Sequence, residues 1–155
     1  MELDAAVALW AESSERVSKA VNGMVTANPI WKPLGVANTP SAATTQTLII
    51  PQSPAAGRMW FIHRVNVLGA DGHTAVAGVA DVYAGPGQEA DATAQLYSGL
   101  TIPSIVVEGM DTHPVMPNER VYAIFYNLAA QQQLQFAVAV EEYPYDARLA
   151  SSASG

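Results

Sequence analysis

Three histidines, His63, His73 and His113, are the side chains in this sequence best suited to bind a metal or to transfer a proton. Their spacing forms neither a His-x-His nor a His-x-x-x-His pair, the patterns that place two ligands on one strand or helix face. A site could still assemble in space, with Asp71 beside His73 or Asp111 beside His113. Both segments are more typical of turns between strands, so we expect no metal or other cofactor.

The remaining catalytic patterns are absent or unsuitable. The sequence has no cysteine, which excludes thiolate nucleophiles, and it has no Gly-x-Ser-x-Gly elbow. The paired histidines of a cupin-type metal enzyme are missing, and Gly85-Pro86-Gly87 lacks the lysine of a phosphate-binding loop. Glu141 and Glu142 are neighbours on a predicted strand, so they point to opposite faces and cannot flank one bond. We therefore predict no enzyme, with these glutamates as charges at a strand end or sheet edge.

Aromatic side chains could form a stacking platform for sugar rings. The residues concerned are Trp31, Trp60, Tyr83, Tyr97, Tyr122, Tyr126, Tyr143 and Tyr145. Packing in a core or an interface is the alternative, since Tyr and Trp place an apolar body inside and a polar tip in water. We favour packing for most of them.

Composition and charge are those of one folded domain. The chain has 155 residues, of which half are hydrophobic and 14% are charged. Its formal charge of −7 has the wrong sign for neutralising phosphates, so we expect no nucleic-acid partner. The segment Met1–Asp4 lacks the basic region of a secretory signal, and no apolar run approaches the ~20 residues of a membrane helix. The expectation is a soluble protein with no membrane partner.

A heptad pattern predicts an amphipathic helix over residues 3–24. Apolar residues recur at alternating steps of four and three, with Ser14 in the one polar place. The seam consists of Leu3, Val7, Trp10, Val17, Val21 and Met24. Such a stripe can simply cover the sheet of its own chain. Because a strict heptad stripe is narrower than that role needs, we favour these residues as an oligomer interface or a dock for another protein.

Residues 25–44 read as an extended arm, because several prolines make a helix or a central strand improbable. Connections of this length inside compact domains usually have a function or are disordered. Ile30, Trp31 and Leu34 are large apolar groups that disordered linkers seldom carry. We therefore expect these three residues to contact a partner.

From residue 45 onward, period-two alternation and turn residues predict a mainly β domain over 45–147, followed by a mobile tail over 148–155. The expected strands are 45–50, 58–68, 75–84, 94–98, 102–108, 119–128 and 133–142. Short strands without intervening helices indicate an antiparallel β-sandwich or, more specifically, a jelly roll. The predicted organisation is thus a helix over 1–24, an arm over 25–44, and this domain.

Two of these strands allow the faces to be assigned. In the last strand, Leu134 and Phe136 begin an apolar face that continues with Val138 and Val140. In the second strand, strict alternation places Met59, Phe61, Val65 and Val67 with His63 on one face. The other face then carries Trp60, Ile62, Arg64, Asn66 and Leu68. Both faces are partly apolar, so that strand is expected to be central or covered on both sides.

Two segments resemble a pattern in minor virion proteins of tailed bacteriophages, especially those of actinobacteria. Residues 54–67 run from a glycine turn into a strand that carries Trp60, and residues 80–85 form a small-residue strand that ends in tyrosine before glycine. The Leu-Trp-Ala-Glu sequence at 9–12 is also similar to the openings of such proteins. The resemblance covers roughly residues 1–85.

The resemblance implies a capsid decoration protein, which combines a β-sandwich or jelly roll with an N-terminal element. Such proteins bind the capsid exterior as oligomers, often trimers. The implied partners are further copies of the chain and the major capsid protein, and Ile30, Trp31 and Leu34 are the residues expected to contact the capsid or a neighbouring subunit. The implied location is the virion surface after synthesis in the host cytoplasm. A tail or fibre domain that binds host-surface carbohydrate is the alternative, and a β-barrel metal enzyme using the histidines is a third.

Overall fold

The computed structural model describes residues 17, 29–108, 113–146 and 148. The predicted helix over 1–24 and its seam therefore lie outside the described residues, apart from Val17. The same holds for the predicted tail beyond Arg148. The oligomer interface expected at Leu3, Val7, Trp10, Val17, Val21 and Met24 stays a prediction.

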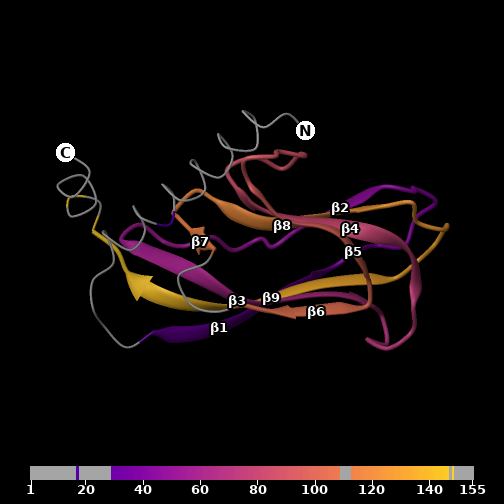
Figure 1. Cartoon of the computed structure of the whole chain (residues 1–155), viewed down its shortest axis with the longest axis horizontal. Coiled ribbons are helices and arrows are strands. Elements are labelled where there is room, and N and C mark those ends of the chain that lie inside the picture. The colour runs from indigo at the N-terminus through magenta and orange to yellow at the C-terminus, as the bar shows by residue number, and fades with distance from the viewer. Residues whose placement is uncertain (1–16, 18–28, 109–112, 147, 149–155) are drawn as a thin grey trace, which may run out of the picture.

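The described residues form antiparallel strands arranged in two layers (Figure 1). The strands are β1 (Ile30–Ala37), β2 (Gln46–Ile49), β3 (Arg58–Gly69), β4 (Val76–Gly85), β5 (Gln95–Ile102), β6 (Ser104–Val107), β7 (Pro114–Val115), β8 (Arg120–Tyr126) and β9 (Leu134–Pro144). One sheet has the order β1-β9-β3-β6, with β7 also paired to β3, and the other has the order β2-β8-β4-β5. The prediction of a mainly β chain built from antiparallel sheets is confirmed.

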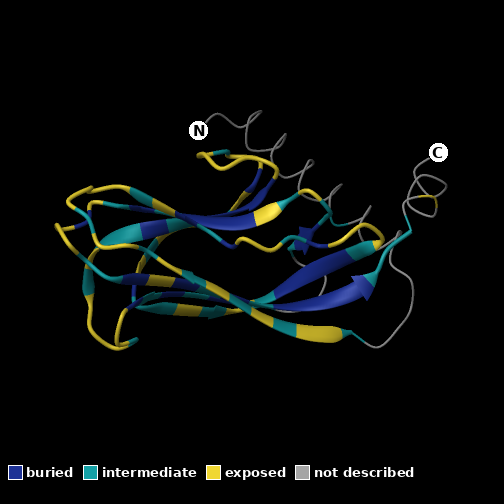
Figure 2. Cartoon of the chain, turned by 180° about the vertical axis from the view of Figure 1, so that it is seen from behind, coloured by how far each residue is buried: buried dark blue, intermediate teal, exposed yellow. Residues whose placement is uncertain are grey.

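The core lies between the two sheets, where side chains from both layers meet. Its largest members are Trp60 of β3, Phe125 of β8 and Phe136 of β9, all buried. The face predicted for the last strand is confirmed, since Leu134, Phe136, Val138 and Val140 all belong to this core. Figure 2 shows that both layers contain buried stretches. Burial of each such side chain contributes about 1.5–3 kcal/mol.

The faces expected for β3 are wrong, because the strand contains a β-bulge. Its pairing with β9 steps from Ile62↔Val140 to Arg64↔Ala139, which leaves His63 as an extra residue. Trp60 and Ile62 before the bulge therefore share the core face with Val65 and Val67 after it. An inserted residue interrupts the strict alternation of side chains between the two faces of a strand. The expectation that β3 is central is confirmed by its position between β9 and β6.

Part of the segment expected as an arm is a strand of the sheet. β1 pairs with β9 from Ile30↔Glu142 to Ala37↔Gln135, with Pro33 opposite Ala139. Proline is tolerated there because β1 lies at the edge of the sheet. The two-sheet body therefore begins at Ile30 rather than at residue 45.

The turn after β3 shows how local chemistry connects the two sheets. Asp71 accepts hydrogen bonds from the backbone amides of His73 and Thr74 at 3.0 and 2.8 Å, which confirms the turn expected there. These bonds, with a side-chain bond from Thr74 as the largest cause, lower the pKa of Asp71 to about 2.

Within the described ranges, the chain has no helix of the length and apolarity that a membrane crossing requires.

Candidate interaction surface

A buried carboxylate of the neighbouring strand holds the first residues of β1 in place. Glu142 of β9, only 6% exposed, accepts a hydrogen bond from the Trp60 indole N–H at 2.7 Å. Lys32 of β1 places its ammonium 3.0 Å from the same carboxylate oxygen. One buried acid therefore joins the edge strand, the central strand and β9.

The electrostatics of this junction favour the charged form of Glu142. Burial alone would raise the pKa of the carboxyl group. The hydrogen bonds from Trp60 and Lys32, with the positive charges of Lys32 and Arg58, outweigh burial and hold the pKa below its ordinary value. A charged Glu142 therefore holds β1 against the body through its contacts with Lys32 and Trp60.

Glu141 lies on the opposite side of the sheet, as expected for adjacent strand residues. Its carboxylate accepts a hydrogen bond from the Tyr143 hydroxyl at 2.9 Å, and His63 Nδ1 lies 3.9 Å away. The ring of Trp31 stands edge-on to the ring of His63, with centroids 4.9 Å apart. Both glutamates are buried, so the expectation of a charge at a strand end or sheet edge is wrong. The reason is that β9 is a central strand and neighbouring side chains cover it.

Two of the three expected contact residues are available to a partner. Ile30 and Trp31 are 48% and 54% exposed, whereas Leu34 packs against the core with Val36. Leu34 is directed inward because it alternates with the exposed Pro33 and Gly35. The start of β1 is accordingly an apolar projection on a rigid strand.

The histidines occupy three separate places. His63 sits at the bulge of β3, His73 in the turn after β3, and His113 just before β7. The Tyr97 hydroxyl donates to Glu108, and His113 Nε2 lies 3.8 Å from the same carboxylate. Within the parts of the chain that the structure describes, no three His, Cys, Asp or Glu residues group as metal ligands. The arrangement ties β5 to the segment before β7.

Most aromatic residues pack rather than form a platform. Trp60, Tyr83, Tyr122 and Tyr143 are buried. The Tyr83 and Tyr122 rings stack with centroids 5.0 Å apart, and the Tyr122 hydroxyl donates to the Glu89 carbonyl at 2.7 Å. Burial is the main cause that raises the pKa of both phenols. Trp31 differs from these residues in its exposure.

The outer face of the β1-β9-β3-β6 sheet carries two further exposed apolar residues that the sequence did not single out. Ile105 and Val107 of β6 are 60% and 63% exposed and pair with Asn66 and Arg64 of β3. Their alternation matches that of core residues, so only the edge position of β6 reveals the exposure. We use "outer face" for the side formed by Trp31, Pro33, Gly35, Ala37, Arg64, Asn66, Ile105, Val107, Gln135, Ala137, Ala139 and Glu141.

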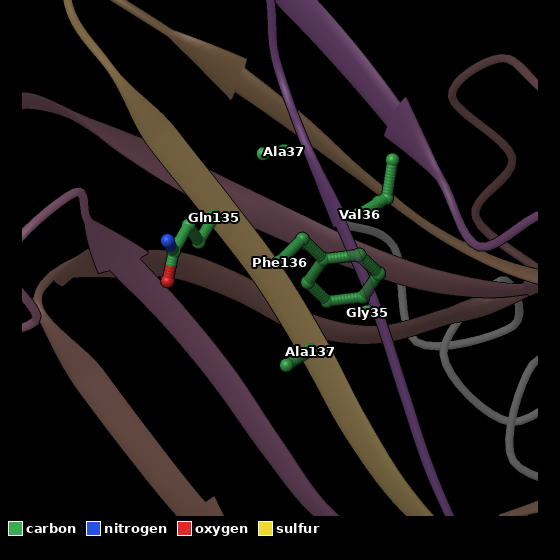
Figure 3. A pocket seen from close by; sticks show the side chains of 6 residues that line it. All are labelled: Gly35, Val36, Ala37, Gln135, Phe136 and Ala137. Atoms are coloured by element: carbon green, nitrogen blue, oxygen red, sulfur yellow. The ribbon is translucent and has the colours of Figure 1, made fainter.

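A hollow lies over two neighbouring strands, where several side chains are small. A shallow hollow of about 280 Å³ lies over β1 and β9 (Figure 3). Its lining includes Gly35 and Ala37 of β1, paired with Ala137 and Gln135 of β9. A Cβ added at Gly35 would make ordinary van der Waals contacts, at 3.6 Å with the Phe136 carbonyl oxygen and at 3.7 Å with the Ala137 Cβ. The face thus combines a projecting Trp31 with a depression on the same strand.

Comparisons with known proteins give no family. No protein-family model and no curated protein matches this chain. A chain from Bacillus endospore appendages, described as disulfide-linked pili, is 14% identical with a TM-score of 0.44, over 79% of this chain and 93% of that chain. A chain of the cyanophage Pam1 capsid asymmetric unit is 15% identical with a TM-score of 0.42, over 81% and 96%. Values this low assign no function.

Proposed function

We propose that this chain is a structural protein of a phage particle, a capsid decoration protein that attaches by apolar contacts. The observation that carries the proposal is the exposure of Ile30 and Trp31 on a strand that a buried carboxylate holds in place. Exposed large apolar groups on a rigid scaffold are typical anchors of protein interfaces. The expected partners are further copies of the chain, as a trimer, and the major capsid protein.

The strand order supports the same proposal. Apart from the two-residue strand β7, which pairs with β3, the strands are ordered β1-β9-β3-β6 in one sheet and β2-β8-β4-β5 in the other, and this order fits a jelly roll. That architecture is the one implied by the resemblance to minor virion proteins. On a symmetric shell, repetition multiplies modest contacts through avidity, so an anchor of two residues is sufficient.

The second candidate is a tail or fibre domain that binds host-surface carbohydrate. It is favoured by one observation, the half-exposed indole of Trp31 beside His63. A glycan array separates the two candidates. Binding that is lost in Trp31→Ala supports carbohydrate recognition over decoration.

The test is the occupancy of the chain on purified particles of the phage that encodes it. We expect Trp31→Ala to reduce the number of copies per particle by about tenfold or more, while the melting temperature changes by less than about 2 °C. Thr47→Ala, an exposed change on the edge strand β2 of the other sheet, is the matched control. Wild-type occupancy for a folded Trp31→Ala protein would show that β1 is not the anchor. Particles that carry no copies of the wild-type chain would end the decoration proposal.

A further inference from the structure

The β-bulge of β3 brings one ionisable side chain beside another. The extra residue is His63, and its Nδ1 lies 3.9 Å from Oε1 of Glu141 on β9. Bulges commonly redirect a side chain in this way. The ring of Trp31 stands edge-on to the same imidazole, with centroids 4.9 Å apart. An exposed indole thus rests on a histidine that faces a buried carboxylate.

The contacts around this pair leave one polar atom of each residue unsatisfied. His63 Nδ1 is buried and has no hydrogen-bond partner. Glu141 is 3% exposed, and among the described residues its carboxylate accepts one hydrogen bond, from the Tyr143 hydroxyl to Oε2. Unused acceptor capacity on a buried carboxylate is costly. A donor on His63 Nδ1 would satisfy both residues at once.

We propose that protonation of His63 closes this gap and thereby sets the position of Trp31. A neutral imidazole has one N–H and no charge, whereas the imidazolium has an N–H on both nitrogens and attracts the carboxylate. A charge-assisted bond of about 2.7–2.9 Å would draw the imidazole about 1 Å closer to Glu141 than the present 3.9 Å. Because the Trp31 ring packs on that imidazole, the indole follows it toward the sheet.

Two charges near His63 act in opposite directions. Glu141 attracts the imidazolium, and Arg64, the next residue of β3, repels it. Arg64 is exposed, so water and salt screen its charge, whereas the buried Glu141 is screened much less. Lys32 and Glu142 pair with each other on the other side of the sheet, beside Trp60. Glu141 is therefore the charge to which a protonated His63 responds.

The β6 side contributes a further group of ionisable residues, which are already bonded. The Glu108 amide donates to the His63 carbonyl oxygen at 2.7 Å. The Glu108 carboxylate accepts from the Tyr97 hydroxyl and lies 3.8 Å from His113 Nε2. These contacts involve the backbone of His63 and not its imidazole.

Urea titrations of the full-length chain at about pH 5.5 and about pH 8 test the pair, because histidine ordinarily changes its charge between these values. The proteins are the wild type, His63→Gln, Glu141→Gln and the double variant. We expect coupling of at least about fivefold in the unfolding equilibrium constant at the lower pH, and of less than about twofold at the higher pH. His73→Gln, at an exposed histidine, replaces His63→Gln in the control cycle and should show no coupling. Equal coupling of His63 and Glu141 at both pH values would overturn the proposal.

Acrylamide quenching of fluorescence follows Trp31 itself. Its share of the signal is the difference between each protein and the corresponding Trp31→Phe variant, since Trp10 and Trp60 also emit. We expect Trp31 to be less accessible to acrylamide at the lower pH, and this difference to be lost in His63→Gln but kept in His73→Gln. No difference in the wild type, or one that persists in folded His63→Gln, would overturn the proposal. This measurement stands even if Glu141→Gln does not fold.

The importance of Trp31 as an anchor rests on the proposed function, whereas its response to pH is measured on the free chain. The two can therefore fail separately. Absence of the pH response with normal particle occupancy leaves the proposed function standing. A pH response in solution, for a chain that particles do not carry, refutes decoration alone.

Discussion

Replacing Trp60 by phenylalanine tests the junction that holds β1. The change removes the indole N–H that donates to Glu142 at 2.7 Å. Hydrogen bonds to charged groups contribute about 1.5–3 kcal/mol, and the smaller ring adds about 1 kcal/mol of lost packing. The total of about 2.5–4 kcal/mol corresponds to a fall in melting temperature of roughly 5–15 °C for a chain of this size.

Melting at two pH values separates the hydrogen bond from the packing. The pKa of Glu142 is lowered in the folded state, so its stabilisation is present above the ordinary pKa near 4.5. That stabilisation is lost as the pH falls through the lower folded pKa. Thermal melts at about pH 7 and about pH 2.5 should therefore show a smaller difference between wild type and Trp60→Phe in acid. Trp31→Phe, the same exchange at an exposed indole, is the control. An equal difference at both pH values would refute the assigned role of the bond.

Further predictions concern the backbone, the core and the predicted helix. Gly78 has φ 106° and a Cβ there would lie 2.6 Å from the Tyr126 carbonyl oxygen, so Gly78→Ala should destabilise folding by at least about 1–3 kcal/mol in urea titrations. Phe136→Ala leaves a cavity at the core and should cost about 3–5 kcal/mol in the same assay. Aspartates at Val7 and Val17 should reduce the solution mass measured by light scattering, and an unchanged mass would place self-association elsewhere.

The alternation of apolar and polar residues predicted the strand faces well where the strand contains no bulge. β9 is the clearest case, because Leu134, Phe136 and Val138 repeat at period two over a strand with regular pairing. β3 shows the limit of the method. Its pattern reads equally well with the phase reversed, and the bulge at His63 cannot be located from residue types alone.

The features that the sequence did not predict depend on where each strand lies in its sheet and not on its residue types. Pro33 made β1 look like an arm, although an edge strand accepts proline. Ile105 and Val107 were not singled out, because residue types alone do not show which face of β6 is turned away from the other sheet. Ile30 and Trp31 are exposed, and the contact role that their size and the nearby prolines indicated stays a prediction.

The bulge at His63 has a consequence for changes in chain length. Residues 62 and 64 pair with consecutive residues of β9, so the strand would keep its cross-strand partners if His63 were deleted. A deletion inside a central strand normally reverses every side chain beyond it. Here the core side chains on both sides would keep their faces, and the loss would fall on the backbone bond from the Glu108 amide and on the ring beside Trp31. Among the residues of β3, His63 is thus the one whose deletion would keep the backbone pairing with β9. The stability lost on deletion would come from contacts at the outer face.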